Sequence, residues 1–192
     1  MKKLFLGLMA VILLLLAGCS QSKEFRIEPV ELSDEQTQLL NVTGNRVSKY
    51  SLKNVPNDET YELKVVYEVY KKKEKIKDEE MMAMRMEPTN ENIEDKELYL
   101  NIQDGKIRLI VGGAYAYMDI EEDINKFGYS TLSKGKNINL GDEVYLFRGT
   151  TAENGISDIG SSGVMSNEEK EKFINDNEMS IFIKLVCEET EA

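Results

Sequence analysis

The sequence predicts a mainly β fold, namely an antiparallel β-sandwich or an open barrel with one or two short helices. Runs in which apolar and polar residues alternate recur from residue 61 towards the C-terminus. Turn-forming pairs such as Asp104-Gly105 and Gly141-Asp142 separate these runs. The chain lacks the strand–helix–strand rhythm that indicates a parallel sheet, and it contains no internal repeat.

The first elements follow from local patterns. FRIEPVEL (25–32) predicts a strand, and SDEQTQLL, which opens on Ser33 with acidic residues behind it, predicts one or two helical turns. YELKVVYEV (61–69) largely alternates and predicts a strand, and MMAMRME (81–87) predicts its antiparallel partner. The segment 71–80 is expected to connect the two. One face of the alternating strand carries Tyr61, Leu63, Val65, Tyr67 and Val69.

A hairpin and further strands follow. The run 97–113 alternates on both sides of Asp104-Gly105, a pair that favours a type I′ turn because both residues tolerate a positive φ. AYAYMDI (114–120) and INLGDEVYLF (138–147) predict additional strands.

The C-terminal part predicts a helix and a last strand. Ser166 and Glu169 form a capping box, which marks the start of the helix SNEEKEKFINDN. MSIFIKLV (179–186) predicts the final strand. Because no domain boundary is indicated after residue 25, the segment 25–192 predicts a single β-rich domain.

The N-terminal residues have the layout of a secretory signal. Lys2 and Lys3 precede an uncharged apolar run from Leu4 to Ala17. This run of about 14 residues is shorter than the roughly 20 that a helix needs to cross the hydrocarbon core. The segment therefore predicts a signal peptide rather than a permanent transmembrane anchor.

The exit from this signal, LAGC (16–19), resembles the lipobox of bacterial lipoprotein precursors. The resemblance covers only the signal and its junction. It implies that the Cys19 thiol receives a diacylglyceryl group, that cleavage follows Gly18, and that residues 1–18 are removed. Two acyl chains anchor a protein that a single chain cannot hold. Residues 19–24 are then the lipidated cysteine and a short tether, which places the domain at the cell membrane, on its extracytoplasmic face.

Composition excludes several classes of function. The formal net charge of −11 becomes −13 without the two signal lysines, so no nucleic acid is expected as a partner. The absence of histidine excludes Ser-His-Asp, Cys-His and histidine–zinc chemistry. Cys187 has no partner once Cys19 is acylated, and we expect it to be a small apolar residue in a strand. Frequent lysine, asparagine, glutamate and isoleucine with scarce arginine is typical of an AT-rich, Gram-positive host.

Three methionines raise the question of a metal site. Met82, Met84 and Met86 alternate along a predicted strand, and thioethers are ligands for Cu(I). Same-face residues of a strand stand about 6.7 Å apart, so three sulfurs converge on one ion only if the strand bends. We therefore expect core packing, and we assign no metal site, no cofactor and no catalytic residue.

A lysine-rich segment is the candidate contact for a polyanion. KKKEKIKDEE (71–80) contains Lys71, Lys72, Lys73, Lys75 and Lys77. These lysines are typical of a solvated hairpin tip that protects a strand edge. Alternatively, they would bind the phosphate groups of a lipid or a wall polymer.

Two other kinds of segment resemble ligand sites only in part. TTAENGISDIGSSGVMS (150–166) lacks the Gly-Lys-Ser/Thr of a P-loop, and we expect a surface loop there. The acidic segments 90–95 and 119–123 do not match an EF-hand calcium loop, although weak peripheral calcium binding stays open.

The sequence thus predicts a membrane-anchored, non-catalytic lipoprotein whose domain binds a polymer or a protein of the cell envelope. Two alternatives stay open. One is an accessory or immunity lipoprotein whose ligand is another protein. The other is an envelope glycan hydrolase that uses a pair of carboxylates. Its first candidates are Asp119, Glu121, Glu122 and Asp158.

Overall fold

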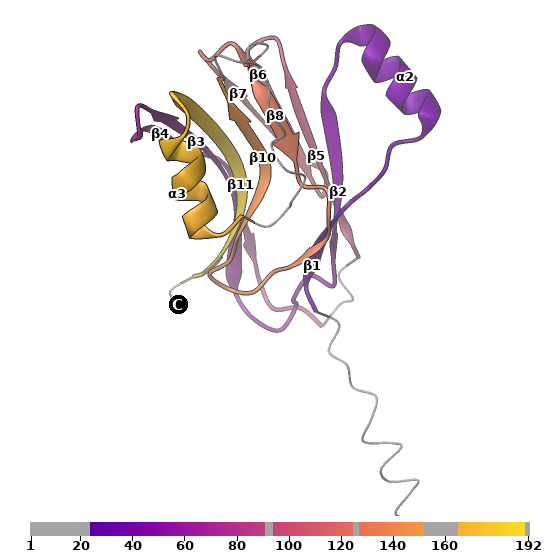
Figure 1. Cartoon of the computed structure of the whole chain (residues 1–192). Coiled ribbons are helices and arrows are strands. Elements are labelled where there is room, and N and C mark those ends of the chain that lie inside the picture. Colours follow the sequence, from indigo (N-terminus) through magenta and orange to yellow (C-terminus); the bar gives the residue numbers. More distant parts are fainter. Residues whose placement is uncertain (1–23, 91–93, 125–126, 152–164, 191–192) are drawn as a thin grey trace, which may run out of the picture.

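A computed structural model describes residues 24–90, 94–124, 127–151 and 165–190. In this part of the chain, two antiparallel sheets pack face to face, and they do not join into a closed barrel (Figure 1). The expected mainly β fold is confirmed, and the structure selects the sandwich over the open barrel.

Sheet A has the strand order β7-β6-β5-β2-β1-β9. Its strands are β7 (Ala114–Asp119), β6 (Lys106–Val111), β5 (Lys96–Gln103), β2 (Val47–Lys53), β1 (Arg26–Pro29) and β9 (Lys136–Asn137). All neighbouring strands are antiparallel. The first described strand of the chain, β1, therefore belongs to this sheet.

Sheet B has the strand order β4-β3-β11-β10-β8. Its strands are β4 (Glu74–Met86), β3 (Tyr61–Lys71), β11 (Met179–Glu189), β10 (Glu143–Thr150) and β8 (Gly128–Thr131). The last strand of the chain, β11, pairs with β3 from the Met179–Lys71 position to the Glu189–Tyr61 position. The sheet is therefore completed only when the C-terminal segment is in place.

The main hydrophobic core lies between the sheets. The residues expected on one face of β3 are all buried, with no exposed surface, and they are Tyr61, Leu63, Val65, Tyr67 and Val69. Tyr50 of β2 is also buried, and its hydroxyl donates a hydrogen bond to the Leu146 carbonyl of β10 at 2.9 Å. A buried hydroxyl without a partner is costly, so this bond allows a tyrosine to fill the core and to join the two sheets.

Helix α2 (Asp34–Thr43) begins at the expected cap. The Ser33 hydroxyl accepts a hydrogen bond from the Gln36 backbone, and the Gln36 side chain accepts one from the Ser33 backbone. The helix ends at Gly44, whose φ of 68° is left-handed. None of its residues is buried, and Figure 1 shows it projecting at the end of the sandwich opposite to the start of β1.

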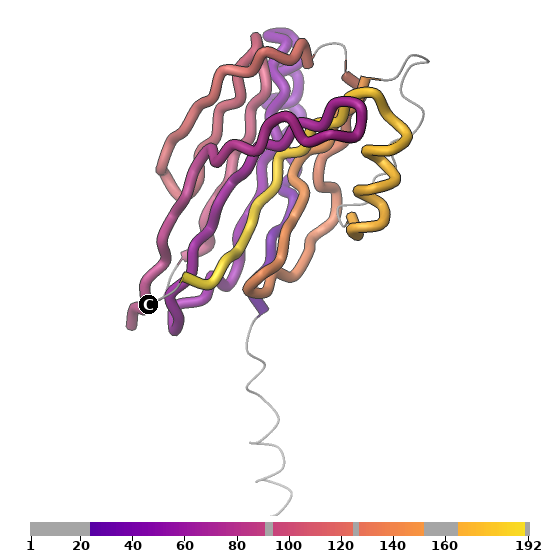
Figure 2. Tube along the Cα trace, turned by 90° about the vertical axis from the view of Figure 1, so that its left-hand side faces the viewer, coloured from indigo at the N-terminus to yellow at the C-terminus, as the bar shows by residue number. Residues whose placement is uncertain are grey.

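Helix α3 (Asn167–Asn175) covers the outer face of sheet B (Figure 2). Its capping box of Ser166 and Glu169 is confirmed. Phe173 and Ile174 of this helix pack with Phe182 of β11 in a second hydrophobic cluster. Within the described residues, no helix has the length and the apolar character that crossing a bilayer requires.

Two tight turns connect neighbouring strands. Asp104 and Gly105 have φ values of 53° and 67°, which confirms the type I′ hairpin between β5 and β6. Lys72 and Lys73 also have positive φ values, 50° and 73°, and join β3 to β4 directly. The expectation of a long connection over 71–80 is therefore wrong, because most of this segment forms the first half of β4.

Candidate functional site

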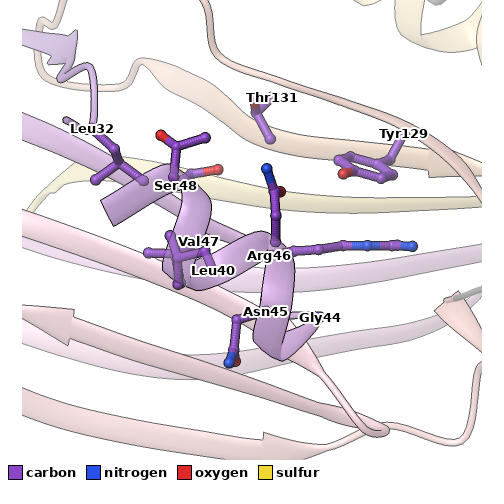
Figure 3. A pocket seen from close by; sticks show the side chains of 11 residues that line it. Leu32, Leu40, Gly44, Asn45, Arg46, Val47, Ser48, Tyr129 and Thr131 are labelled. Carbon is purple, nitrogen blue, oxygen red and sulfur yellow. The ribbon is translucent and has the colours of Figure 1, made fainter. Parts of the chain in front are cut away.

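A hollow of about 480 Å³ lies beside α2. Its walls come from α2 and the chain before it, from the start of β2, and from β8 of the other sheet (Figure 3). The apolar part of the lining consists of the side chains of Leu32, Leu40 and Val47. The neutral hydrogen-bonding side chains of the lining are those of Thr37, Asn41, Asn45, Ser48 and Thr131. The hollow thus combines an apolar wall with uncharged polar groups, a combination common in ligand sites.

The sequence builds this hollow through the end of α2. Gly44 adopts a left-handed conformation, and its backbone N–H bonds to the Asn41 carbonyl at 3.3 Å. The Thr43 hydroxyl donates to the Leu39 carbonyl at 2.9 Å, so the last turn of the helix is closed. The chain therefore turns sharply after the helix. Arg46, two residues after Gly44, faces β8.

Arg46 is the charged residue of this hollow. Its guanidinium carbon lies 4.9 Å from the centre of the Tyr129 ring, and Figure 3 shows the side chain extending alongside that ring. Tyr129 in turn stacks on Phe147 of β10, with the ring centres 5.5 Å apart. This stack positions the guanidinium through a cation–π contact.

Arg46 has no acidic counterpart here. No carboxylate lines the hollow, and Arg46 makes no ion pair with any residue that the structure describes. Because no ion pair engages them, its donors can bind an anionic group in a bidentate manner. The carboxylates near this arginine line a smaller neighbouring hollow, and they are Asp104, Glu121, Glu122 and Asp123. Binding is the chemistry that this arrangement supports, because the lining residues include no general base beside a nucleophile.

The five candidate lysines do not form one patch. Lys71, Lys72 and Lys73 are exposed at the turn between β3 and β4. The Lys75 ammonium instead lies 3.1 Å from the Glu68 carboxylate and 2.7 Å from the Asp78 carboxylate. Lys77 forms ion pairs with Glu122 at 3.1 Å and with Glu121 at 3.7 Å.

Glu68 is the centre of a buried ionic network beneath α3. Its side chain is only 1% exposed, and its carboxylate lies 3.1 Å from Lys75, 2.8 Å from Lys170 of α3 and 2.9 Å from Lys184 of β11. The Lys170 ammonium also lies 5.4 Å from the centre of the Tyr145 ring. The network therefore joins α3 to the sheet through ionic and cation–π contacts.

The candidate carboxylates of the hydrolase hypothesis are separated. Asp119 is exposed and pairs with Lys106 at 3.2 Å, while Asp158 lies outside the described residues. Glu121 and Glu122 line a smaller hollow of about 230 Å³, which also borders Arg46.

Glu122 is not arranged as a general acid. Burial raises the pKa of its carboxyl group, but hydrogen bonds from Tyr67 and Lys77 outweigh burial and lower that pKa below the usual value. A general acid of a glycosidase needs a raised pKa instead. Among the described residues, no group of three or more acidic or cysteine side chains has a geometry that could hold a metal ion.

The sulfur-containing residues are packed in the core. Met82, Met84 and Met86 are partly buried and pack against the main hydrophobic cluster, as expected. Cys187 is buried in β11, and burial raises the pKa of its thiol to about 11. Gly18 and Cys19 lie outside the described residues, and so does most of the segment 150–166.

The chain matches no protein-family model, no curated protein and no solved structure. Sequence reasoning missed Arg46 and Tyr129, because neither belongs to a motif and they meet only across the two sheets.

Proposed function

We propose that this chain is a lipid-anchored, extracytoplasmic lipoprotein that binds a component of the cell envelope and catalyses no reaction. The hollow beside α2 is its binding site. The Arg46 guanidinium, which lies over Tyr129 and forms no ion pair with a described residue, carries the proposal. It suits a ligand with a carboxylate or phosphate group next to an apolar part, since Leu32, Leu40 and Val47 supply the apolar wall.

The anchor part of the proposal rests on the sequence LAGC (16–19) after an apolar run. The position of the hollow is compatible with such an anchor. The start of β1 and the projecting helix α2 lie at opposite ends of the sandwich (Figure 1). A body tethered through Cys19 would therefore carry its binding site at the end remote from the attachment point.

Mass spectrometry of the protein from cells that process lipoprotein precursors tests the anchor. We expect an N-terminal Cys19 that carries a diacylglyceryl group, and a Cys19→Ser variant that is lost from the membrane fraction. An intact Met1, or an unmodified Cys19 thiol, would contradict the anchor.

Titration with purified envelope polymers tests the binding site. The probes are lipoteichoic acid, which carries phosphate, and soluble peptidoglycan fragments, which carry carboxylates. For the probe that binds, Arg46→Gln is expected to weaken binding by roughly 10–100-fold, because a hydrogen bond to a charged group contributes about 1.5–3 kcal/mol.

Arg85→Gln is the matched control. This residue is an arginine on the edge strand β4, paired with Glu87, and lies outside the hollow. Equal losses in both variants would show a nonspecific charge effect and refute the assigned site. Binding of neither probe by the wild type would refute the proposed ligand chemistry.

A further inference from the structure

The two outer faces of the sandwich differ. Helix α3 packs on the outer face of sheet B. On the side of sheet A, the described helix is α2, which projects at one end of the sandwich (Figure 1). The pairing registers place alternate residues of β7, β6, β5, β2 and β1 on the outer face of sheet A. The chemistry of this face indicates what it contacts.

Aromatic and apolar side chains lie on one half of this face. Tyr115 and Tyr117 of β7 are 58% and 63% exposed, with ring centres 6.2 Å apart. Ile110 of β6 stands between two tyrosines across the strands. It is paired with Tyr115 of β7 on one side and with Tyr99 of β5 on the other. Tyrosine has an apolar ring and a polar tip, which suits the boundary between lipid headgroups and acyl chains.

The same face is locally basic on an acidic protein. The chain has a formal net charge of −11, yet basic side chains outnumber acidic ones on this face. The basic residues of the face are Arg26, Lys49, Lys53, Lys106 and Arg108, and the acidic ones are Glu28, Glu97 and Asp119, which gives the face a formal net charge of +2. Lys49 pairs with Glu97 at 2.6 Å and Lys106 with Asp119 at 3.2 Å, and Glu28 pairs with both Arg26 and Lys53. Arg108, next to Tyr117, donates to the Asn101 amide oxygen at 2.9 Å and forms no ion pair with a described residue.

The proposed anchor residue, Cys19, is close in sequence to the first strand of sheet A. Strand β1 belongs to sheet A and begins at Arg26, seven positions after Cys19. Residues 19–24 extend over at most about 20 Å. A sandwich anchored at Cys19 thus stays close enough to the bilayer to lay sheet A against it.

We infer that, in the anchored protein, the outer face of sheet A rests on the anionic outer leaflet of the membrane. The inference depends on the proposed anchor and adds a second, reversible contact. The tyrosines and Ile110 enter the headgroup region, and the basic side chains lie among lipid phosphates. The face alone binds weakly, but the anchor holds it at a millimolar effective concentration.

A vesicle-coupled form of the chain tests the inference. Both hydrophobic clusters lie between Phe25 and Cys187, so a chain that begins at Cys19 retains the complete sandwich. Cys187 is buried, and a maleimide lipid therefore couples this chain through Cys19. The vesicles contain phosphatidylcholine, with or without phosphatidylglycerol. Nitration of tyrosines, followed by mass spectrometry, reports which rings are covered.

Tyr115 and Tyr117 are expected to be nitrated several-fold more slowly on anionic vesicles than on neutral ones. Tyr129, which is 39% exposed on β8, is the internal control and should not change. Each basic residue near an anionic leaflet changes the docking constant by about fivefold. The triple variant Lys49→Gln, Lys106→Gln and Arg108→Gln should therefore weaken docking by about a hundredfold and abolish the protection.

The turn variant Lys71→Gln, Lys72→Gln and Lys73→Gln removes the same charge elsewhere and should keep the protection. Protection lost in the turn variant but kept in the face variant would overturn the inference, as would the absence of protection on anionic vesicles. Chemical coupling replaces cellular lipidation, and the assay does not involve Arg46. Failure here therefore leaves the proposed anchor and binding site untouched, and their failure is recognised by their own experiments.

Discussion

Replacing Glu68 with glutamine tests the buried network beneath α3. Burial by itself would raise the pKa of this carboxyl group, but hydrogen bonds and charges from Lys170 and Lys184 outweigh burial and lower that pKa from 4.5 to about 2. At 1.36 kcal/mol per pKa unit, the charged form is stabilised by about 3 kcal/mol in the folded protein. Glu68→Gln removes this stabilisation and leaves three ammonium groups around a neutral amide.

We therefore expect Glu68→Gln to lower the free energy of unfolding by about 3 kcal/mol at neutral pH, which is within the range for breaking a buried ion pair. Urea denaturation followed by circular dichroism measures this change. The matched control is Glu62→Gln, on the same strand and face, because Glu62 is partly exposed and pairs with Lys64 at 3.1 Å. A partly exposed pair contributes at most about 1 kcal/mol.

The pH dependence has a defined sign. The pKa of Glu68 is lower in the folded than in the unfolded chain, so its stabilisation is present above about pH 4.5 and is lost as the pH falls towards 2. The difference between wild type and Glu68→Gln should shrink to about 1 kcal/mol near pH 3. A loss no larger than that of Glu62→Gln, or a difference that does not change with pH, would refute the reasoning.

Two further predictions concern a turn and a thiol. Replacing Lys72-Lys73 with Asn-Gly should raise the free energy of unfolding by about 1 kcal/mol, because these residues adopt positive φ at lower cost. Urea denaturation measures the free energy of unfolding. A variant less stable than the wild type would contradict the turn geometry. In a chain that begins at Ser20, Cys187 should react with a disulfide reagent only after unfolding, since burial raises the pKa of its thiol to about 11. Rapid labelling of the folded chain at mildly alkaline pH would show that this thiol is accessible.

The strands that sequence reasoning missed have a common physical cause. Strand β2, VSKYSLK, buries only Tyr50 and Leu52 deeply and carries serine and lysine on its outer side. β8 has four residues and β9 has two, which is too short for alternation to be recognised. These strands exist because longer neighbours offer unpaired backbone groups.

The candidate site shows the same limit. The cap at Ser33 predicted the start of α2, but no local pattern distinguishes Arg46 from the other arginines. Its role depends on Tyr129, which belongs to the opposite sheet. Likewise, alternation placed Glu68 correctly on the polar face of β3, but its partner Lys170 lies 102 positions away, on a helix that covers that face.

The sequence by itself determined the properties that depend on neighbours within a few residues. These are the inward face of β3, both helix caps and the Asp104-Gly105 turn. Only the tertiary structure decided which polar faces are covered and which stay open. It buried Glu68 under α3, set Arg46 against Tyr129 and left the tyrosines of sheet A exposed. The reason is that strand order and helix placement arise from many weak contacts between distant segments, and no local pattern records their sum.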